Sequence, residues 1–122
     1  MMKVKKVKIG IKSIEESLEN AKNTMRLIEQ GKEVKKEVGV YFTSFEAFRK
    51  ALTPKRLELL HIIKARNPNS IKELAEITKR DMKNISEDVK YLEQIGLIEK
   101  KEQEKEIRPL INYGKLALEI GI

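Results

Sequence analysis

The sequence has no cysteine, no tryptophan and a single histidine among its 122 residues. The absence of cysteine excludes disulfides, thiolate metal sites and cysteine nucleophiles. The one histidine, His61, cannot by itself complete a metal site or a catalytic triad. No glycine-rich phosphate-binding loop is present, and Gly31, Gly39, Gly96 and Gly114 are placed at element ends or turns. We therefore expect no catalytic residues, no metal ligands, no cofactor and no enzyme activity.

The chain also lacks an apolar run of about 18 residues that could span a bilayer, and nothing in it resembles a signal peptide. We accordingly expect a cytoplasmic protein without a membrane partner. The length is close to the commonest size of one domain. A formal net charge of +7 favours a polyanionic partner. The abundance of lysine, glutamate and isoleucine is typical of archaeal or thermophile-like composition.

The most informative stretch runs from Ser70 to Gly96, where two amphipathic helices joined by a tight turn are predicted. Ser70 and Glu73 have the spacing of a capping box, which begins the first helix. After the turn, Asp81 is a suitable N-cap for the second helix. Apolar residues of the second helix recur every three or four positions, and a glycine ends it; they are Ile85, Val89, Leu92, Ile95 and Gly96.

A β-hairpin is predicted after these helices. Leu97–Ile98 and Ile107–Ile111 are interpreted as two short strands around a polar tip formed by the charged run from Glu99 to Glu106. Two helices followed by a hairpin indicate a winged helix-turn-helix, in which the second helix enters the DNA major groove. The predicted fold class is therefore α+β, dominated by helices.

Three segments within residues 52–111 are the most distinctive: LTPKRLELLHIIK, SIKELAEITKRD and VKYLEQIGLIEK. They resemble the small predicted transcriptional regulators of archaea and bacteria that carry a MarR- or ArsR-like winged helix. The resemblance implies sequence-specific binding to double-stranded DNA as a homodimer, most simply as a repressor. Regulators of this type are often antitoxins, so the alternative is a winged-helix adaptor or antitoxin that neutralises a partner protein. A metal- or ligand-sensing repressor is disfavoured by the absence of cysteine and clustered histidine.

In a winged helix the recognition helix contacts base edges, the turn and first helix contact phosphates, and the hairpin, or wing, reaches the minor groove. Asn84 can pair bidentately with adenine, and Lys83 can reach guanine or a phosphate. The resulting candidates are Lys83, Asn84, Ser86 and Glu87 for base readout, Lys72, Lys79 and Arg80 for phosphates, and Lys100, Lys101, Lys105 and Arg108 in the wing.

The charge of this region complicates DNA recognition. Between Lys72 and Lys90, five basic residues are balanced by five acidic ones. Glu87 stands where the resembled family usually has a basic residue, and a carboxylate there repels phosphates. Either Glu87 pairs with Lys83 or Lys90 on the helix and leaves the surface usable, or the winged helix binds a protein. Its neighbour Asp88 is expected on a solvated face.

The first 43 residues predict a strand-helix-strand extension that acts as an assembly or dimerisation module. Lys3–Lys12 and the segment from Val34 to about Thr43 alternate as strands do. Between them, Ser13 and Glu16 form a capping box and Gly31 ends the helix. The apolar stripe of that helix consists of Ile14, Leu18, Ala21, Met25 and Ile28.

Residues 44–111 are assigned to the DNA-binding domain and residues 112–122 to a C-terminal strand. This strand is expected to join the N-terminal sheet, unless a second subunit covers the same apolar face. Within the DNA-binding domain, Thr43 and Glu46 predict a capping box for a first helix. Thr53 and Pro54 begin the next, which runs to about Arg66 with its inward residues at Leu57, Leu60 and Ile63.

Overall fold

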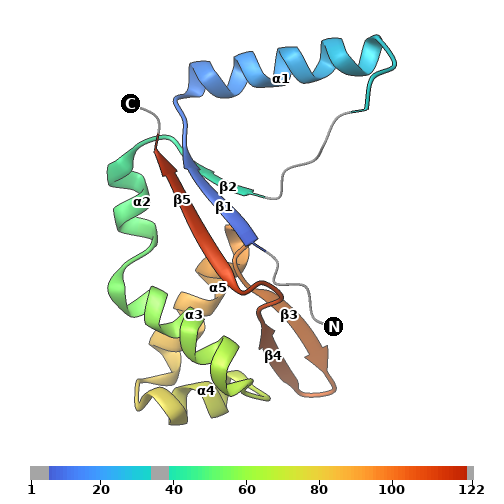
Figure 1. Cartoon of the computed structure of the whole chain (residues 1–122). Coiled ribbons are helices and arrows are strands. Elements are labelled where there is room, and N and C mark those ends of the chain that lie inside the picture. The colour runs from blue at the N-terminus through green and yellow to red at the C-terminus, as the bar shows by residue number, and fades with distance from the viewer. Residues whose placement is uncertain (1–5, 34–38, 121–122) are drawn as a thin grey trace. The chain divides into compact units, whose positions relative to one another are not determined.

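The structure, a computed structural model, describes residues 6–33 and 39–120, which form an α+β fold of five helices and five strands (Figure 1). These residues divide into two units. The helical unit, residues 52–114, contains α3 (Pro54–Arg66), α4 (Ile71–Thr78), α5 (Met82–Gln94), β3 (Glu99–Gln103) and β4 (Glu106–Leu110). The sheet unit, residues 6–33, 39–51 and 115–120, contains β1 (Lys6–Ile11), α1 (Ile14–Glu29), β2 (Gly39–Phe42), α2 (Phe45–Ala51) and β5 (Lys115–Ile120). In the described ranges no helix is long and apolar enough to cross a bilayer.

The start of α3 and most of its inward face are as predicted. Thr53 Oγ1 accepts a hydrogen bond from the backbone N–H of Arg56 at 3.2 Å, and Pro54 follows as the first helical residue. The buried residues of α3 are Leu59, Leu60 and Ile63. The prediction for Leu57 is wrong, because this side chain is 42% exposed. It lies roughly a third of a turn around the helix from the centre of the buried face.

The turn between α4 and α5 follows the predicted signals with two differences. Ser70 Oγ accepts from the N–H of Glu73 at 3.0 Å, while the Glu73 carboxylate accepts from the N–H of Asn69, one residue before the position expected for a capping box. Helix α4 ends at Thr78, and its C-cap, Lys79, has a left-handed backbone conformation (φ 55°). Asp81 occupies the N-cap of α5, but its side chain makes no capping hydrogen bond.

The core of the helical unit lies where its three helices meet the residues that lead into the hairpin. The fully buried side chains include Leu59, Ile63, Leu74, Ile85, Leu92 and Leu97. The predicted apolar residues Ile85, Val89 and Leu92 are the buried residues of α5, and Gly96 has a left-handed φ of 90° after the helix ends. Tyr113 closes this core, because its hydroxyl donates to the carbonyl of Leu97 at 2.7 Å.

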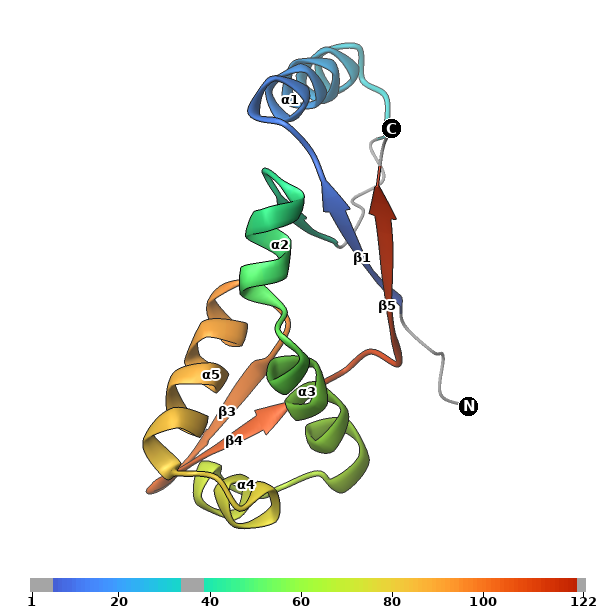
Figure 2. The same ribbon diagram turned by 90° about the vertical axis from the view of Figure 1, so that its left-hand side faces the viewer.

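The hairpin is longer than predicted. Strands β3 and β4 pair antiparallel from Glu99 opposite Leu110 to Gln103 opposite Glu106 (Figure 2). Most of the charged run that was interpreted as a polar tip is therefore strand, whereas Leu97 and Ile98 are buried residues that precede it. Every residue of β3 is exposed, so backbone pairing holds the strand while its charged side chains stay hydrated.

The sheet unit contains a three-stranded parallel sheet with the order β2-β1-β5 (Figure 1). Its central strand pairs with the C-terminal strand from Lys6 opposite Lys115 to Ile11 opposite Ile120. The prediction that the two ends of the chain share one sheet is thus confirmed for the described residues. The parts of the two predicted N-terminal strands at residues 3–5 and 34–38 lie outside the described residues.

Helix α2 packs on the sheet through aromatic contacts. The rings of Phe42 and Phe48 meet edge to face, with their centroids 5.8 Å apart. The capping residue of α2 is Ser44, whose Oγ accepts from the N–H of Ala47 at 3.1 Å. The prediction of Thr43 as the cap was one residue too early, because β2 ends at Phe42 and α2 begins at Phe45. Helix α1 begins at the predicted cap, Ser13, and has no buried residue.

Candidate nucleic-acid interface

The outward face of α5 presents all four candidate readout residues together. Lys83, Asn84, Ser86 and Glu87 are exposed, whereas Ile85 is completely buried. This follows from the helical period, which turns positions 85, 89 and 92 towards the core. The face therefore offers an amide, a hydroxyl, an ammonium and a carboxylate to solvent within little more than one turn of helix.

The phosphate candidates differ in their surroundings. Lys72 and Lys79 are exposed, and Lys79 occupies the left-handed position at the end of α4. Arg80, in contrast, is half-buried, and its Nη2 donates to Asp88 Oδ2 at 2.8 Å. The Arg80 side chain therefore joins the turn to α5, in addition to any contact it makes with a ligand.

Asp88 is the centre of a charged cluster that the sequence did not predict. Its other carboxylate oxygen accepts from Arg56 Nε at 3.1 Å, so one carboxylate binds two arginines from different elements. The Arg56 guanidinium also lies over the ring of Tyr91, 4.2 Å from its centroid. The expectation that Asp88 lies on a solvated face is wrong, because its side chain is only 15% exposed. Two guanidinium groups for one carboxylate leave a formal charge of +1 beside the turn.

The signal for this cluster was present in the helical period. Asp88 follows Ile85 by three residues and precedes Leu92 by four, so it lies at the edge of the buried stripe. A carboxylate at the edge of a core needs a partner because burial of an isolated charge is costly. The partners Arg56 and Arg80 could not be identified, because Arg56 lies 32 residues away in the sequence.

Among the described residues of α5, Glu87 has no lysine partner, although such a pair was one of the two alternatives that the sequence allowed. In the part of the chain that the structure describes, no ion pair joins Glu87 to Lys83 or Lys90. The negative charge of Glu87 is thus exposed beside Lys83 and Asn84. A ligand of this face must tolerate a carboxylate near its centre.

The four wing candidates have three different surroundings: one lysine is in an ion pair, two residues form a like-charge pair, and one lysine lies at the tip. Lys100 Nζ lies 3.4 Å from a carboxylate oxygen of Glu93 on α5. Lys101 is directly opposite Arg108 in the antiparallel register, so two like charges share one face of the hairpin. Like charges directly opposite on paired strands destabilise the hairpin, and a bound anion would reduce that repulsion. Lys105 is exposed at the tip, next to Glu104 at φ 26°.

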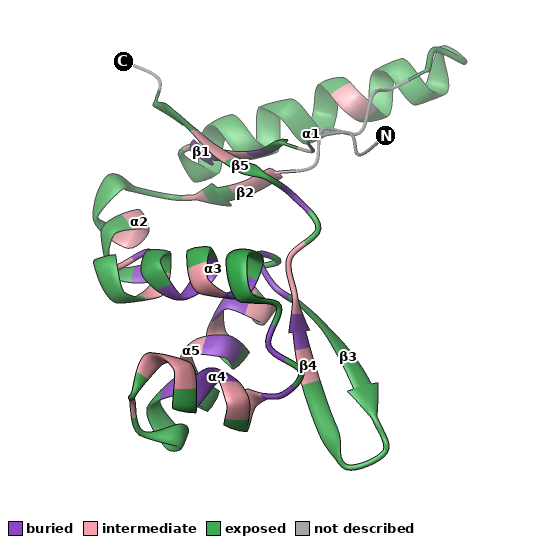
Figure 3. Ribbon diagram, turned by 60° about the horizontal axis from the view of Figure 1, so that its bottom comes forward, coloured by how far each residue is buried: buried purple, intermediate pink, exposed green. Residues whose placement is uncertain are grey.

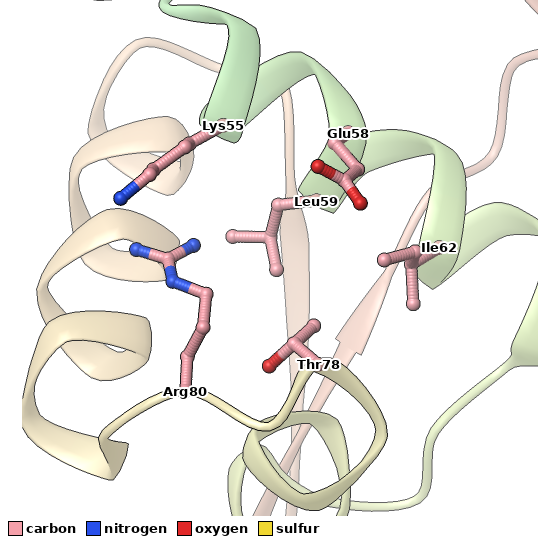
Figure 4. Close-up of a pocket in the computed structure, with 6 residues that line it drawn as sticks. All are labelled: Lys55, Glu58, Leu59, Ile62, Thr78 and Arg80. Carbon is pink, nitrogen blue, oxygen red and sulfur yellow. The ribbon is translucent and has the colours of Figure 1, made fainter.

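Two hollows accompany these surfaces. A pocket of about 160 Å³ lies between α3 and the turn after α4, and its lining includes Leu59, Ile62 and Thr78. Figure 4 shows the Lys55 ammonium and the Arg80 guanidinium on one side of this pocket and Glu58 with Ile62 on the other. A groove of about 210 Å³ separates α5 from the hairpin, with Ser86, Lys90, Lys100 and Ile107 among its lining residues.

Comparison with known proteins adds a family but no relative of known activity. A search of curated proteins found no match to this sequence. The family model HVO_A0114 matches residues 51–118. The match covers the whole helical unit and extends into β5, and it spans more than half of the chain. The chain therefore belongs to the HVO_A0114 family.

Proposed function

We propose that the helical unit binds double-stranded DNA and regulates transcription, most simply as a cytoplasmic repressor that covers its operator as a homodimer. The observation that carries the proposal is the outward face of α5, where Lys83, Asn84 and Ser86 are exposed directly after the turn. The order of three helices and a hairpin supports a winged helix in which α5 enters the major groove. The like-charge pair of Lys101 and Arg108 supports a phosphate contact by the hairpin.

In this arrangement the residues have separate tasks. Lys79 and Lys72 would neutralise phosphates and set the position of the unit on the duplex. Asn84 would select adenine through a bidentate contact in the major groove. The cluster of Arg56, Asp88 and Arg80 would hold the turn against α5, so that these groups keep a fixed spacing.

The test is fluorescence anisotropy on the DNA upstream of the protein's own coding sequence and on a scrambled duplex, at low salt and at about 0.15 M salt. The proposal predicts tighter binding to the upstream DNA that persists at the higher salt. Asn84→Ala should reduce the preference between the duplexes by roughly tenfold, since one bidentate contact is lost. Lys79→Ala should weaken both duplexes alike and reduce the salt slope by about one unit.

Lys32→Ala is the matched control for the loss of one charge, because Lys32 is exposed in the sheet unit. It should leave both affinities nearly unchanged. Arg80→Ala is a poorer probe than Lys79→Ala, because it also removes the contact with Asp88. Equal binding of wild type to both duplexes, abolished at about 0.15 M salt, would refute sequence-specific regulation.

A second candidate function is protein binding by an adaptor or antitoxin. The groove between α5 and the hairpin favours it, because its lining includes Ile107, which is 40% exposed. Glu87→Gln separates the two functions. If the ligand is DNA, removal of this exposed carboxylate should tighten binding several-fold at low salt. If the ligand is a basic protein surface, the same change should weaken the complex and create no affinity for DNA.

A further inference from the structure

Helix α1 presents an apolar stripe that nothing in the described residues covers. None of its 16 residues is buried, and most of the helix is exposed (Figure 3). The side chains of Ile14, Leu18, Met25 and Ile28 are each exposed by about 60% or more. An isolated helix of this length is marginally stable in water, and most helices in proteins are stabilised by packing of an apolar face. The stripe therefore requires a partner surface.

The strands of the same unit offer such a surface only in part. On one face of the sheet Lys8 pairs with Glu119 at 2.9 Å, and Lys12 lies over the ring of Tyr41, so this face is polar. On the other face Val7 and Ile9 are already buried, and Phe42 packs against Phe48 of α2. Three further apolar side chains of this face are half-buried, and Leu118 and Ile120 of β5 are exposed; the half-buried ones are Ile11, Val40 and Leu116. The sheet therefore has fewer exposed apolar side chains on this face than the stripe of α1 presents.

The charges beside the stripe identify its partner. The stripe has heptad spacing, with Ile14, Ala21 and Ile28 in one of its two core positions and Leu18 and Met25 in the other. When two such helices pair antiparallel, the residues directly after Ile14, Ala21 and Ile28 lie beside the corresponding residues of the partner helix. In this helix they are Glu15, Lys22 and Glu29.

We propose that two copies of this chain associate through antiparallel α1 helices, in the register that places Glu15 of one copy beside Lys22 of the other. In this register Ile14 packs against the partner's Met25, and Leu18 packs against the partner's Ala21. By symmetry each contact occurs twice, so the interface contains two pairs of opposite charge. The antiparallel direction also opposes the two helix dipoles favourably.

The competing registers are less favourable. An antiparallel pair shifted by one heptad would bring Glu15 beside the partner's Glu29 and the two copies of Lys22 together. A parallel pair would place Ser17 near the partner's Lys22 and Thr24 near the partner's Glu29, with no pair of opposite charge. Charge therefore selects one direction and one register.

This inference deepens the proposed function and rests on it for the use of the dimer, because two linked helical units can bind two DNA half-sites at once. The interface spans about two heptads and is smaller than a standard stable interface, so we expect association in the range of roughly 10–100 μM. The test is analytical ultracentrifugation of the full chain without DNA. Its result is thus independent of whether the protein binds DNA.

The wild-type mass should rise with concentration towards twice the 14.2 kDa of one chain. Leu18→Glu should keep the protein monomeric. Glu15→Lys and Lys22→Glu should each weaken association about tenfold, since two attractive contacts become repulsive. The double variant Glu15→Lys/Lys22→Glu should restore association to near the wild-type level. Glu16→Lys is the matched control, because it makes the same change in the same helical turn on the face opposite the stripe.

Three results would overturn the proposal. A wild-type protein that stays monomeric up to about 1 mM would exclude this interface. A dimer that persists in Leu18→Glu would place the contact elsewhere, and a double variant that fails to recover would exclude the register. Thermal melts followed by circular dichroism test the alternative, in which the stripe packs on the sheet of its own chain. If Leu18→Glu lowers the melting temperature of a monomer regardless of concentration, the stripe packs on the chain's own sheet.

Discussion

The two units of this chain differ in how much of their apolar surface they cover. In the helical unit, Leu59, Ile63, Leu74, Ile85 and Leu92 are fully buried, and the large apolar side chains left exposed are few. In the sheet unit the buried apolar residues are Val7, Ile9 and Ala51, while most of the exposed large ones lie along α1 and at the end of β5. The helical unit thus buries most of its large apolar side chains in a core of its own, whereas the sheet unit leaves most of its large apolar side chains exposed, as an interaction surface would.

The largest expected difference is between equivalent leucine truncations in the two units. Leu92→Ala in α5 should lower the free energy of unfolding by about 2–5 kcal/mol, because it leaves a cavity in a filled core. Leu18→Ala in α1 should change it by less than about 0.5 kcal/mol, because that side chain is 59% exposed and alanine favours helix.

Urea unfolding followed by circular dichroism measures both values. The protein concentration should be a few micromolar, below the expected dimer dissociation constant, so that association does not add to the stability. A loss in Leu18→Ala as large as that in Leu92→Ala would mean that α1 is packed in the folded monomer. The contrast between the units would then be wrong.

Ion pairs in the two units provide an intermediate contrast. Asp88→Asn should cost about 1–3 kcal/mol of unfolding free energy, because it leaves Arg56 and Arg80 adjacent without their shared carboxylate. Glu119→Gln should cost less than about 0.5 kcal/mol, because the Glu119 side chain is 68% exposed and solvent screens its pair with Lys8.

The adjacent control is Glu87→Gln, which removes an exposed carboxylate one residue from Asp88 and should be nearly neutral. Urea titrations at low and high salt complete the test, since the cost of Asp88→Asn should shrink as salt screens the two arginines. Equal effects of Asp88→Asn and Glu87→Gln would show that the cluster contributes no stability.

These contrasts also show how much of the fold could be predicted from the sequence. The caps at Ser13, Thr53 and Ser70 and the helices that follow them were predicted, because capping and helical period are local properties. The place of the C-terminal strand in the N-terminal sheet was predicted, because two strands are too few to form a stable sheet, whereas its pairing with β1 is seen only in the structure. The charged strand β3 was not, because backbone pairing holds it without any apolar pattern.

The candidate site was predictable to a similar degree. The helical period alone places Lys83, Asn84, Ser86 and Glu87 on the outward face of α5. The contacts of Asp88 were not predictable, because they join residues from α3, the turn and α5 that only the tertiary structure brings together. The binding function of the face stays a prediction, since exposure alone selects no ligand.

The smallest expected difference is between two tyrosines, and it depends on pH. Burial raises the pKa of Tyr113 from 10.0 to about 12, and its hydroxyl donates to Leu97. The unfolded chain releases this proton near pH 10, whereas the folded protein holds it to about pH 12. This contribution to stability is therefore fully present below pH 10 and is lost as the pH rises to 12. At pH 7, Tyr113→Phe should cost about 1 kcal/mol because the Leu97 carbonyl loses its donor.

Tyr113→Phe should also remove this contribution to the alkaline loss of stability, which urea midpoints measured between pH 8 and about 11.5 would detect. Tyr41→Phe in the sheet unit is the matched change, because the Tyr41 side chain is 37% exposed. It should retain the alkaline loss, since Tyr113 is still present. An unchanged alkaline profile in Tyr113→Phe would contradict the assignment of this titration to the buried core. Titration of a tyrosine is coupled to folding stability where its hydroxyl is buried, and Tyr113 meets that condition in the core of the helical unit.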